Sequence, residues 1–187
     1  MPALSLWGGG GVRVAAIDSA TTSGWDVVER IGGAREAVVG HGRWRFRGRT
    51  AAEVAAAVDQ LVAYQPDVVA LESPYVGSNA DTALVLAELL GRFRQEVERR
   101  GLPTVTTKAA VWALGILRGL ISPASPRAAR KAASVLWARR SLGIDAGDDE
   151  CDALGLAVWT LRTSLAPTTL ALALPEPRGG RRRRKAA

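Results

Sequence analysis

Two short runs of apolar residues, each ending in a carboxylate, organise the pattern of hydrophobic and polar positions along this chain. Residues 12–17 are almost continuously apolar and lead to Asp18, and residues 67–71 lead in the same way to Glu72. Strands that are apolar on both faces are typical of parallel sheets that are covered by helices on both sides. The stretch between the two runs is long enough for a crossover. The pattern therefore predicts parallel neighbours, with both acids at the same end of the sheet.

A carboxylate after a single strand has an ordinary alternative, because Asp often caps a turn. Small, mainly hydroxylated residues from Ser19 to Gly24 turn the chain toward a second strand. Two buried strands that both end in an acid are harder to explain as turn caps alone, since an unpaired buried carboxylate is costly. The repetition favours a functional site at the carboxyl ends of the strands, where open α/β sheets place such groups.

The rest of the chain alternates between strand-like and helix-like segments, which predicts an α/β fold with a five-stranded mixed sheet flanked by helices. Thr50 and Glu53 form a capping box at the start of the clearest helix. The expected strands are 12–17, 25–28, 36–46, 67–71 and 102–106, and the expected helices are 50–64, 79–100, 108–117, 126–142 and 148–161. In helix 126–142 we expect Ala128, Ala132, Val135 and Leu136 to face inward, opposite Arg127, Arg130, Lys131 and Ser134.

Helix 79–100 carries apolar residues on more than one stripe. A helix lying on a sheet needs one buried face, so the second face predicts a partner, in this case a homodimer. The alternative is a helix that is merely rich in alanine and leucine.

Composition indicates one ordinary domain. The chain has 187 residues, 48% of them hydrophobic, and no apolar run long enough to span a membrane. We expect a folded domain over residues 12–165, a flexible glycine-rich arm over 1–11 that is no signal peptide, and a disordered basic tail over 166–187. A single cysteine, Cys151, excludes an internal disulfide, and a single histidine, His41, leaves too few ligands for a zinc site.

The net charge of +7 points to an anionic partner, with nucleic acid favoured over a membrane surface. Much of the excess lies in the tail, at residues 181–185. Four arginines alternate at the end of strand 36–46: Arg43, Arg45, Arg47 and Arg49. They are either a phosphate-contacting edge or charges that protect an edge strand from aggregation. The basic face of helix 126–142 is likewise either solvated or a contact for the DNA backbone.

The last helix adds two more acids. Asp149 and Asp152 are three residues apart and share a face. Capping and the helix dipole account for acids in a first turn, but they account less well for Asp152, which precedes the apolar run 153–159. Oxygen ligands without His or Cys select Mg²⁺ or Mn²⁺. Two such ions, roughly 3.5–4 Å apart, activate a water and stabilise the leaving oxygen in phosphoryl transfer.

Three motifs together resemble the RuvC-type Holliday junction resolvases, which belong to the ribonuclease H-like nucleases. The family begins with a strand ending in Asp and a turn to a second strand, as in residues 16–24. Its second acid is followed by an aromatic residue three positions on and then by Asn-Ala-Asp-x-Ala-Leu, as in residues 72–84. Its last motif has an acid three residues before Asp-Ala-Leu, as in residues 149–154. The resemblance spans residues 12–164 and implies a ribonuclease H-like fold.

The resemblance also implies roles for individual residues. Two Mg²⁺ or Mn²⁺ ions per active site would be bound by Asp18, Glu72, Asp149 and Asp152. Lys108 and Lys131 would lie near the cleaved phosphate, and Tyr75 would stack at the junction's strand crossover. Further DNA contacts would come from Asn79, Arg127, Arg130 and Lys131. The expected enzyme is a homodimer that cuts four-way DNA junctions by paired symmetric nicks, leaving 5′-phosphate and 3′-hydroxyl ends.

The sequence also departs from the family and leaves alternatives open. Ser19-Ala20 replaces the frequent Pro-Gly, residues 109–125 are longer than usual, and the arginine tail is an addition. Asp148 or Glu150 could take the place of Asp149. A related nuclease acting on other branched DNA, flaps or RNA–DNA hybrids would use the same acids. A non-catalytic nucleic-acid-binding protein would need them only as caps. We expect a cytoplasmic protein of a bacterial cell or of a phage-infected host cell.

Overall fold

The computed structural model describes residues 11–31, 35–74 and 79–163. The strands in these residues are β1 (Val12–Ile17), β2 (Thr22–Ile31), β3 (Arg35–Arg45), β4 (Val68–Ser73) and β5 (Thr104–Lys108). The helices are α1 (Ala51–Val62), α2 (Ala80–Arg99), α3 (Ala109–Ile116), α4 (Arg127–Leu142) and α5 (Asp148–Thr163). The five strands form one mixed sheet in the order β3-β2-β1-β4-β5. The predicted fold class is therefore confirmed.

The sheet is mixed because only its first three strands are connected as hairpins. β1 pairs antiparallel with β2, and β2 pairs antiparallel with β3. β4 runs parallel to both β1 and β5, with Leu71 opposite Ile17 and Thr106 opposite Leu71. Consequently β1, β3, β4 and β5 all end at the same edge of the sheet. Asp18 and Glu72 follow neighbouring residues on adjacent strands, as the sequence predicted.

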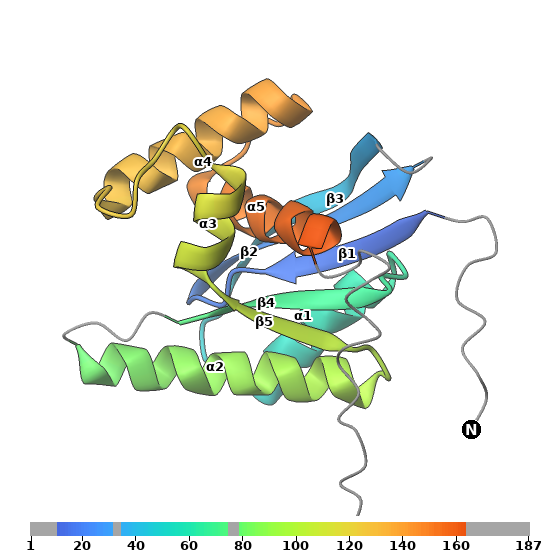
Figure 1. Cartoon of the computed structure of the whole chain (residues 1–187). Coiled ribbons are helices and arrows are strands. Elements are labelled where there is room, and N and C mark those ends of the chain that lie inside the picture. Colours follow the sequence, from blue (N-terminus) through green and yellow to red (C-terminus); the bar gives the residue numbers. More distant parts are fainter. Residues whose placement is uncertain (1–10, 32–34, 75–78, 164–187) are drawn as a thin grey trace, which may run out of the picture.

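Helices cover both faces of the sheet (Figure 1), with α1 and α2 on one face and α3, α4 and α5 on the other. Alternate residues of β1 serve the two layers. Val14 and Ala16 belong to the core beneath α5, whereas Ala15 and Ile17 belong to the core beneath α1 and α2. This two-sided burial is the reason that residues 12–17 are nearly all apolar.

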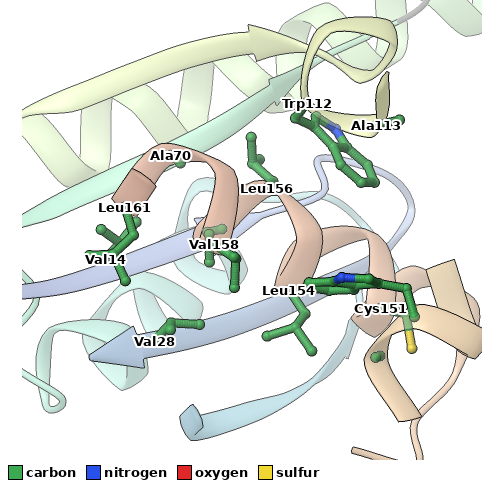
Figure 2. Packing of buried hydrophobic residues seen from close by; sticks show 14 of the residues in the cluster. Val14, Val28, Ala70, Trp112, Ala113, Cys151, Leu154, Leu156, Val158 and Leu161 are labelled. Atoms are coloured by element: carbon green, nitrogen blue, oxygen red, sulfur yellow. The ribbon is translucent and has the colours of Figure 1, made fainter. Parts of the chain in front are cut away.

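Helix α5 lies across the centre of its face, where Leu154, Val158 and Leu161 are fully or almost fully buried (Figure 2). Two glycine contacts bring α3 close to it. A Cβ on Gly155 would stand 2.5 Å from the Trp112 ring, and a Cβ on Gly115 would stand 2.7 Å from the Trp159 ring. In each helix, a glycine therefore leaves room for a tryptophan ring from the other helix. This packing holds α3 over the end of β4.

Helix α1 begins as predicted. Thr50 is its N-cap and accepts from the Glu53 N–H, while the Glu53 carboxylate accepts from the Thr50 N–H, so the capping box is complete. The strand boundaries differ by a few residues. Strand β2 is longer at both ends than predicted, β4 includes Glu72, and β3 ends at Arg45, so that Arg47 and Arg49 do not continue its alternation.

The predicted inward face of α4 is wrong. Ala128, Ala132 and Leu136 are exposed and Val135 is half-buried, whereas the buried residues are Ala133, Ser134, Trp137 and Ala138. The indole of Trp137 buries more apolar area than any residue of the predicted face. The Ser134 hydroxyl can turn inward because it has polar neighbours there, the Arg130 carbonyl oxygen 3.3 Å away and the Asp152 carboxylate. The helix is thus rotated by part of a turn from its expected setting.

Several predictions concern residues outside the described ranges. The arm over residues 1–11, except for Gly11, the basic tail over 166–187 and Tyr75 all belong to this group. Within the described residues, none of the helices combines the length and apolar character needed to cross a bilayer.

Candidate active site

Carboxylates from three elements meet at the carboxyl ends of the central strands. Asp18 follows β1, Glu72 lies near the end of β4, and Asp149 and Asp152 lie in the first turns of α5. Burial raises the pKa of Asp18 well above its usual range, and repulsion from the other three carboxylates raises it further. The four acids that the sequence singled out are therefore close enough to influence one another.

Glu72 and Asp152 each have one hydrogen-bond donor that partly offsets burial. Burial raises the pKa of Glu72 to about 7, although the Trp112 indole N–H donates to its Oε2 over 2.6 Å and lowers it. Burial also raises the pKa of Asp152 to about 6, against a hydrogen bond from Ser134 that lowers it. Both carboxylates therefore hold a proton more tightly than an exposed acid does.

Lys131 brings the positive charge of α4 to this cluster. Its Nζ lies 2.7 Å from Asp148 Oδ2 and 2.8 Å from Asp149 Oδ1. Partial burial opposes the charge on the amine, but the two hydrogen bonds outweigh it and raise the pKa of Lys131. The same contact with Lys131 lowers the pKa of Asp148. Of the two predicted lysines, Lys131 thus lies directly at the acids.

Gly24 allows α5 to approach the sheet at this point. A Cβ on Gly24 would overlap the backbone carbonyl of Asp149. The Gly24 carbonyl oxygen also accepts the N–H of Asp18 over 3.0 Å. Gly24 therefore fixes the backbone of Asp18 and makes room for Asp149.

Glu150 is one of the two residues that could take the place of Asp149, but its side chain points away from the cluster. Its Oε1 lies 3.3 Å from His41 Nδ1 on β3, and its Oε2 accepts the Gly147 N–H.

Asp26 lies beneath Glu150 and is fully buried. Burial raises the pKa of Asp26 well above its usual range, and repulsion from Glu150 raises it further. Cys151 is buried as well, and burial raises the pKa of its thiol to about 12, so it is a packed thiol rather than a reactive one.

The other predicted site residues surround the acids at greater distance. Lys108 ends β5, opposite Ser73, and within the described part of the chain its side chain has no hydrogen bond or ion pair with the acids. Asn79 caps α2 by accepting the Thr82 N–H over 3.1 Å. Arg127 begins α4, and its charge lowers the pKa of Glu72, so it lies on the same side. Arg130 lies one turn further along α4.

The donor set suits a hard divalent cation. All four acids offer only oxygen, and the mutual repulsion that raises the pKa of Asp18 is the kind of interaction that a bound cation relieves. Within the described residues, however, no three His, Cys, Asp or Glu side chains are placed to hold an ion. Asp149 is turned to Lys131 and Glu72 to Trp112 instead. The four acids therefore fit the chemistry of a divalent-cation site. In this structure, two of them are hydrogen-bonded to Trp112 and Lys131.

Sequence reasoning missed Trp112, Ser134 and Gly24 as parts of the site. Trp112 and Ser134 donate to acids that are 40 and 18 positions away in the chain, and no local pattern indicates such a contact. Gly24 was visible only as a turn residue. A large ring in a short apolar helix that directly follows a strand end was the one available signal for Trp112.

The fold is similar to that of solved Holliday junction resolvases. Thermus thermophilus RuvC superposes with a TM-score of 0.64 and 19% identity, over 82% of this chain and 97% of that one. The fowlpox virus resolvase, solved with its substrate Holliday junction DNA, gives a TM-score of 0.58 and 9% identity, over 83% of this chain and 100% of that one. The yeast mitochondrial Holliday junction resolvase Ydc2 gives a TM-score of 0.53 and 12% identity, over 81% of this chain and 78% of that one.

No protein-family model and no curated protein matches this chain. The likeness to the solved structures therefore concerns the fold. The chain has the ribonuclease H-like fold of the RuvC-type resolvases, as its motifs predicted.

Proposed function

We propose that this protein is a metal-dependent, structure-selective DNA endonuclease that resolves four-way junctions. One observation carries the proposal: Asp18, Glu72, Asp149 and Asp152 influence one another at the strand ends of a resolvase fold. An acid that only capped a turn would lie at the surface, where its pKa would stay near the usual range. Two of these acids instead have pKa values of about 6 and 7.

The four carboxylates would hold two Mg²⁺ or Mn²⁺ ions. Such ions supply an activated water and stabilise the leaving oxygen of the phosphodiester. Asp18 and Glu72 are held by adjacent parallel strands, so the sheet sets their spacing. Lys131 carries a positive charge beside Asp149 and would stabilise the negative charge that builds up on the phosphate during cleavage.

A homodimer would supply two such sites for paired nicks in opposite strands. The outward side of α2 supports this part of the proposal, because Leu84 is 69% exposed while Leu89, Phe93 and Val97 pack against the sheet. An exposed leucine on a long helix gains from burial against a second copy.

The central test is Asp18→Asn. The substitution removes one charge from the acid cluster and leaves every arginine in place. We expect cleavage of a labelled four-way junction in Mg²⁺ to be abolished while junction binding is retained. Four-way, flap, RNA–DNA hybrid and linear substrates are compared with and without Mg²⁺, and the cuts are mapped.

Asp59→Asn is the matched control, because Asp59 is an exposed acid of α1 paired with Arg100, distant from the site. It should cut as the wild type does. Retained cleavage by Asp18→Asn would refute the assignment of the acids. Equal cutting of flaps or hybrids would favour a less selective nuclease of the same fold, and symmetric cuts in opposing strands would support the dimer.

A further inference from the structure

The arginines of this protein differ in whether a carboxylate pairs with them. Those on α2 are paired: Arg92 with Glu88, Arg94 with Glu98 and Arg99 with Glu96. Arg43 and Arg45, at the carboxyl end of β3, are exposed, and within the described ranges neither guanidinium has an ion-pair or hydrogen-bond partner. Their charge is free to attract an anion.

Strand pairing places both side chains on the α5 face of the sheet, at the edge where the acids lie. Arg43 lies opposite Gly24 on β2, and the open side of Gly24 faces Asp149. Opposite residues of paired strands project to the same face, and so does Arg45, two residues further on. An Nη1 of Arg43 also lies 3.8 Å from where a Cβ on Gly147 would stand. The two arginines therefore flank the start of α5, at the end of the sheet that carries the candidate active site.

A second basic flank lies on the other side of the acids. Arg127 at the start of α4 is near enough to Glu72 to lower its pKa, and Lys131 contacts Asp149. β3 is an edge strand of the sheet, and α4 is the outermost of the helices on the α5 face (Figure 1). The acids thus lie between two sources of positive charge.

A groove adjoins the β3 arginines. It has a volume of about 390 Å³, lies between β3 and α1, and is lined by both arginines together with Trp44, Phe46 and Gln60. Trp44 is held in place because its indole N–H donates to Gln60 over 2.8 Å and its ring stacks on Trp25. The groove belongs to the α1 face of β3, behind the face on which the arginines meet the start of α5, and its packed tryptophan fixes the strand that carries them.

We propose that Arg43 and Arg45 form a phosphate-binding surface that holds the DNA backbone on the β3 side of the active site, opposite Arg127. This inference rests on the proposed nuclease function and adds a path for the substrate, across the end of the sheet from β3 to α4. Guanidinium groups bind phosphate oxygens in a fork geometry and release condensed counterions from DNA. Charges that only protected an edge strand would not need to lie on the face and at the end of the sheet that carry the acids.

The double variant Arg43→Gln/Arg45→Gln tests the surface. Junction binding is measured without divalent cations, so that nothing is cut, over a series of salt concentrations. Loss of two phosphate contacts should lower the slope of log affinity against log salt by about 2 and weaken binding roughly tenfold per contact near 0.1 M salt. Arg35→Gln is the matched control, because Arg35 is an exposed arginine at the opposite end of the same strand. Thermal unfolding of each variant verifies that it is folded.

The outcomes are distinct. A reduced slope in the double variant with an unchanged slope in Arg35→Gln supports the surface. Unchanged binding by the double variant, or an equal loss in the control, overturns it. Cleavage by the wild type in Mg²⁺ tests the nuclease function separately. A wild type that binds DNA through these arginines without cutting it would refute that function and retain the surface, and a wild type that binds no DNA would refute both.

Discussion

Trp112 is the residue on which the geometry of Glu72 depends most directly. Its ring is 2% exposed and is confined by Gly155 of α5, and its N–H reaches Glu72 Oε2 over 2.6 Å (Figure 2 shows the ring above α5). Groups that hydrogen-bond a metal ligand orient it and commonly affect metal affinity by about 10- to 100-fold. We therefore assign Trp112 a positioning role for Glu72.

Trp112→Phe should keep most of the ring in place and remove only the N–H donor. We expect Mg²⁺ affinity to fall about 10-fold or more. The chain has six tryptophans, so the indole N–H signals of a ¹⁵N spectrum can be followed during a Mg²⁺ titration. The signal that is missing in the variant should be the one that Mg²⁺ shifts most in the wild type.

Trp159→Phe provides the comparison, because Trp159 packs on Gly115 in the same pair of helices. It should bind Mg²⁺ as the wild type does. If Trp112→Phe also binds Mg²⁺ normally, the indole has no positioning role.

At the scale of elements, the position of α5 on β2 brings Asp149 and Asp152 to the strand ends. The contact depends on Gly24, since any side chain there would overlap the backbone of Asp149. The sequence pattern predicted the wrong buried face for α4, because it favoured Ala128 and Ala132 over Trp137. Its actual setting turns Ser134 toward Asp152 and still lets Lys131 reach Asp149. The rotation of α4 therefore determines which of its side chains meet the acids.

Gly24→Ala should displace the first turn of α5. A shift of about 1 Å at reacting groups lowers rates by roughly 100-fold, and the forced contact costs about 1–3 kcal/mol of stability. Junction cleavage and thermal unfolding are measured together. Gly91→Ala, on α2 in open space, is the control and should leave cleavage unchanged and stability equal or slightly higher. Normal cleavage by Gly24→Ala would contradict the importance of this contact.

At the scale of the whole molecule, the acid cluster makes stability depend on pH. The folded-state pKa values of Glu72 and Asp152, about 7 and about 6, exceed their ordinary values of 4.5 and 3.8. Between the ordinary and the raised values the folded state binds more protons than the unfolded chain. The free energy of unfolding therefore decreases as the pH rises through this window. Bound cations would reverse the trend, because they favour the ionised carboxylates.

Without divalent cations, the protein should be less stable at pH 8 than at pH 5, by on the order of 2 kcal/mol. Thermal unfolding should show a Tm lower by roughly 4–8 °C at the higher pH. Adding Mg²⁺ should raise the Tm at pH 8 far more than at pH 5. Glu72→Gln should reduce both the pH dependence and the effect of Mg²⁺. A Tm that rises steadily from pH 5 to pH 8 without cations would contradict the buried acid cluster.

The amino-acid sequence by itself determined the strands, the mixed sheet and the acids at the strand ends, because apolar periodicity is a local property and parallel strands bring Asp18 and Glu72 to one edge. The tertiary structure alone decided which donors meet those acids and which face of α4 is buried. Trp112 and Glu72 are 40 residues apart, and their contact depends on how α3 packs against Gly155. Such contacts follow from side-chain volumes across layers, which no local pattern encodes.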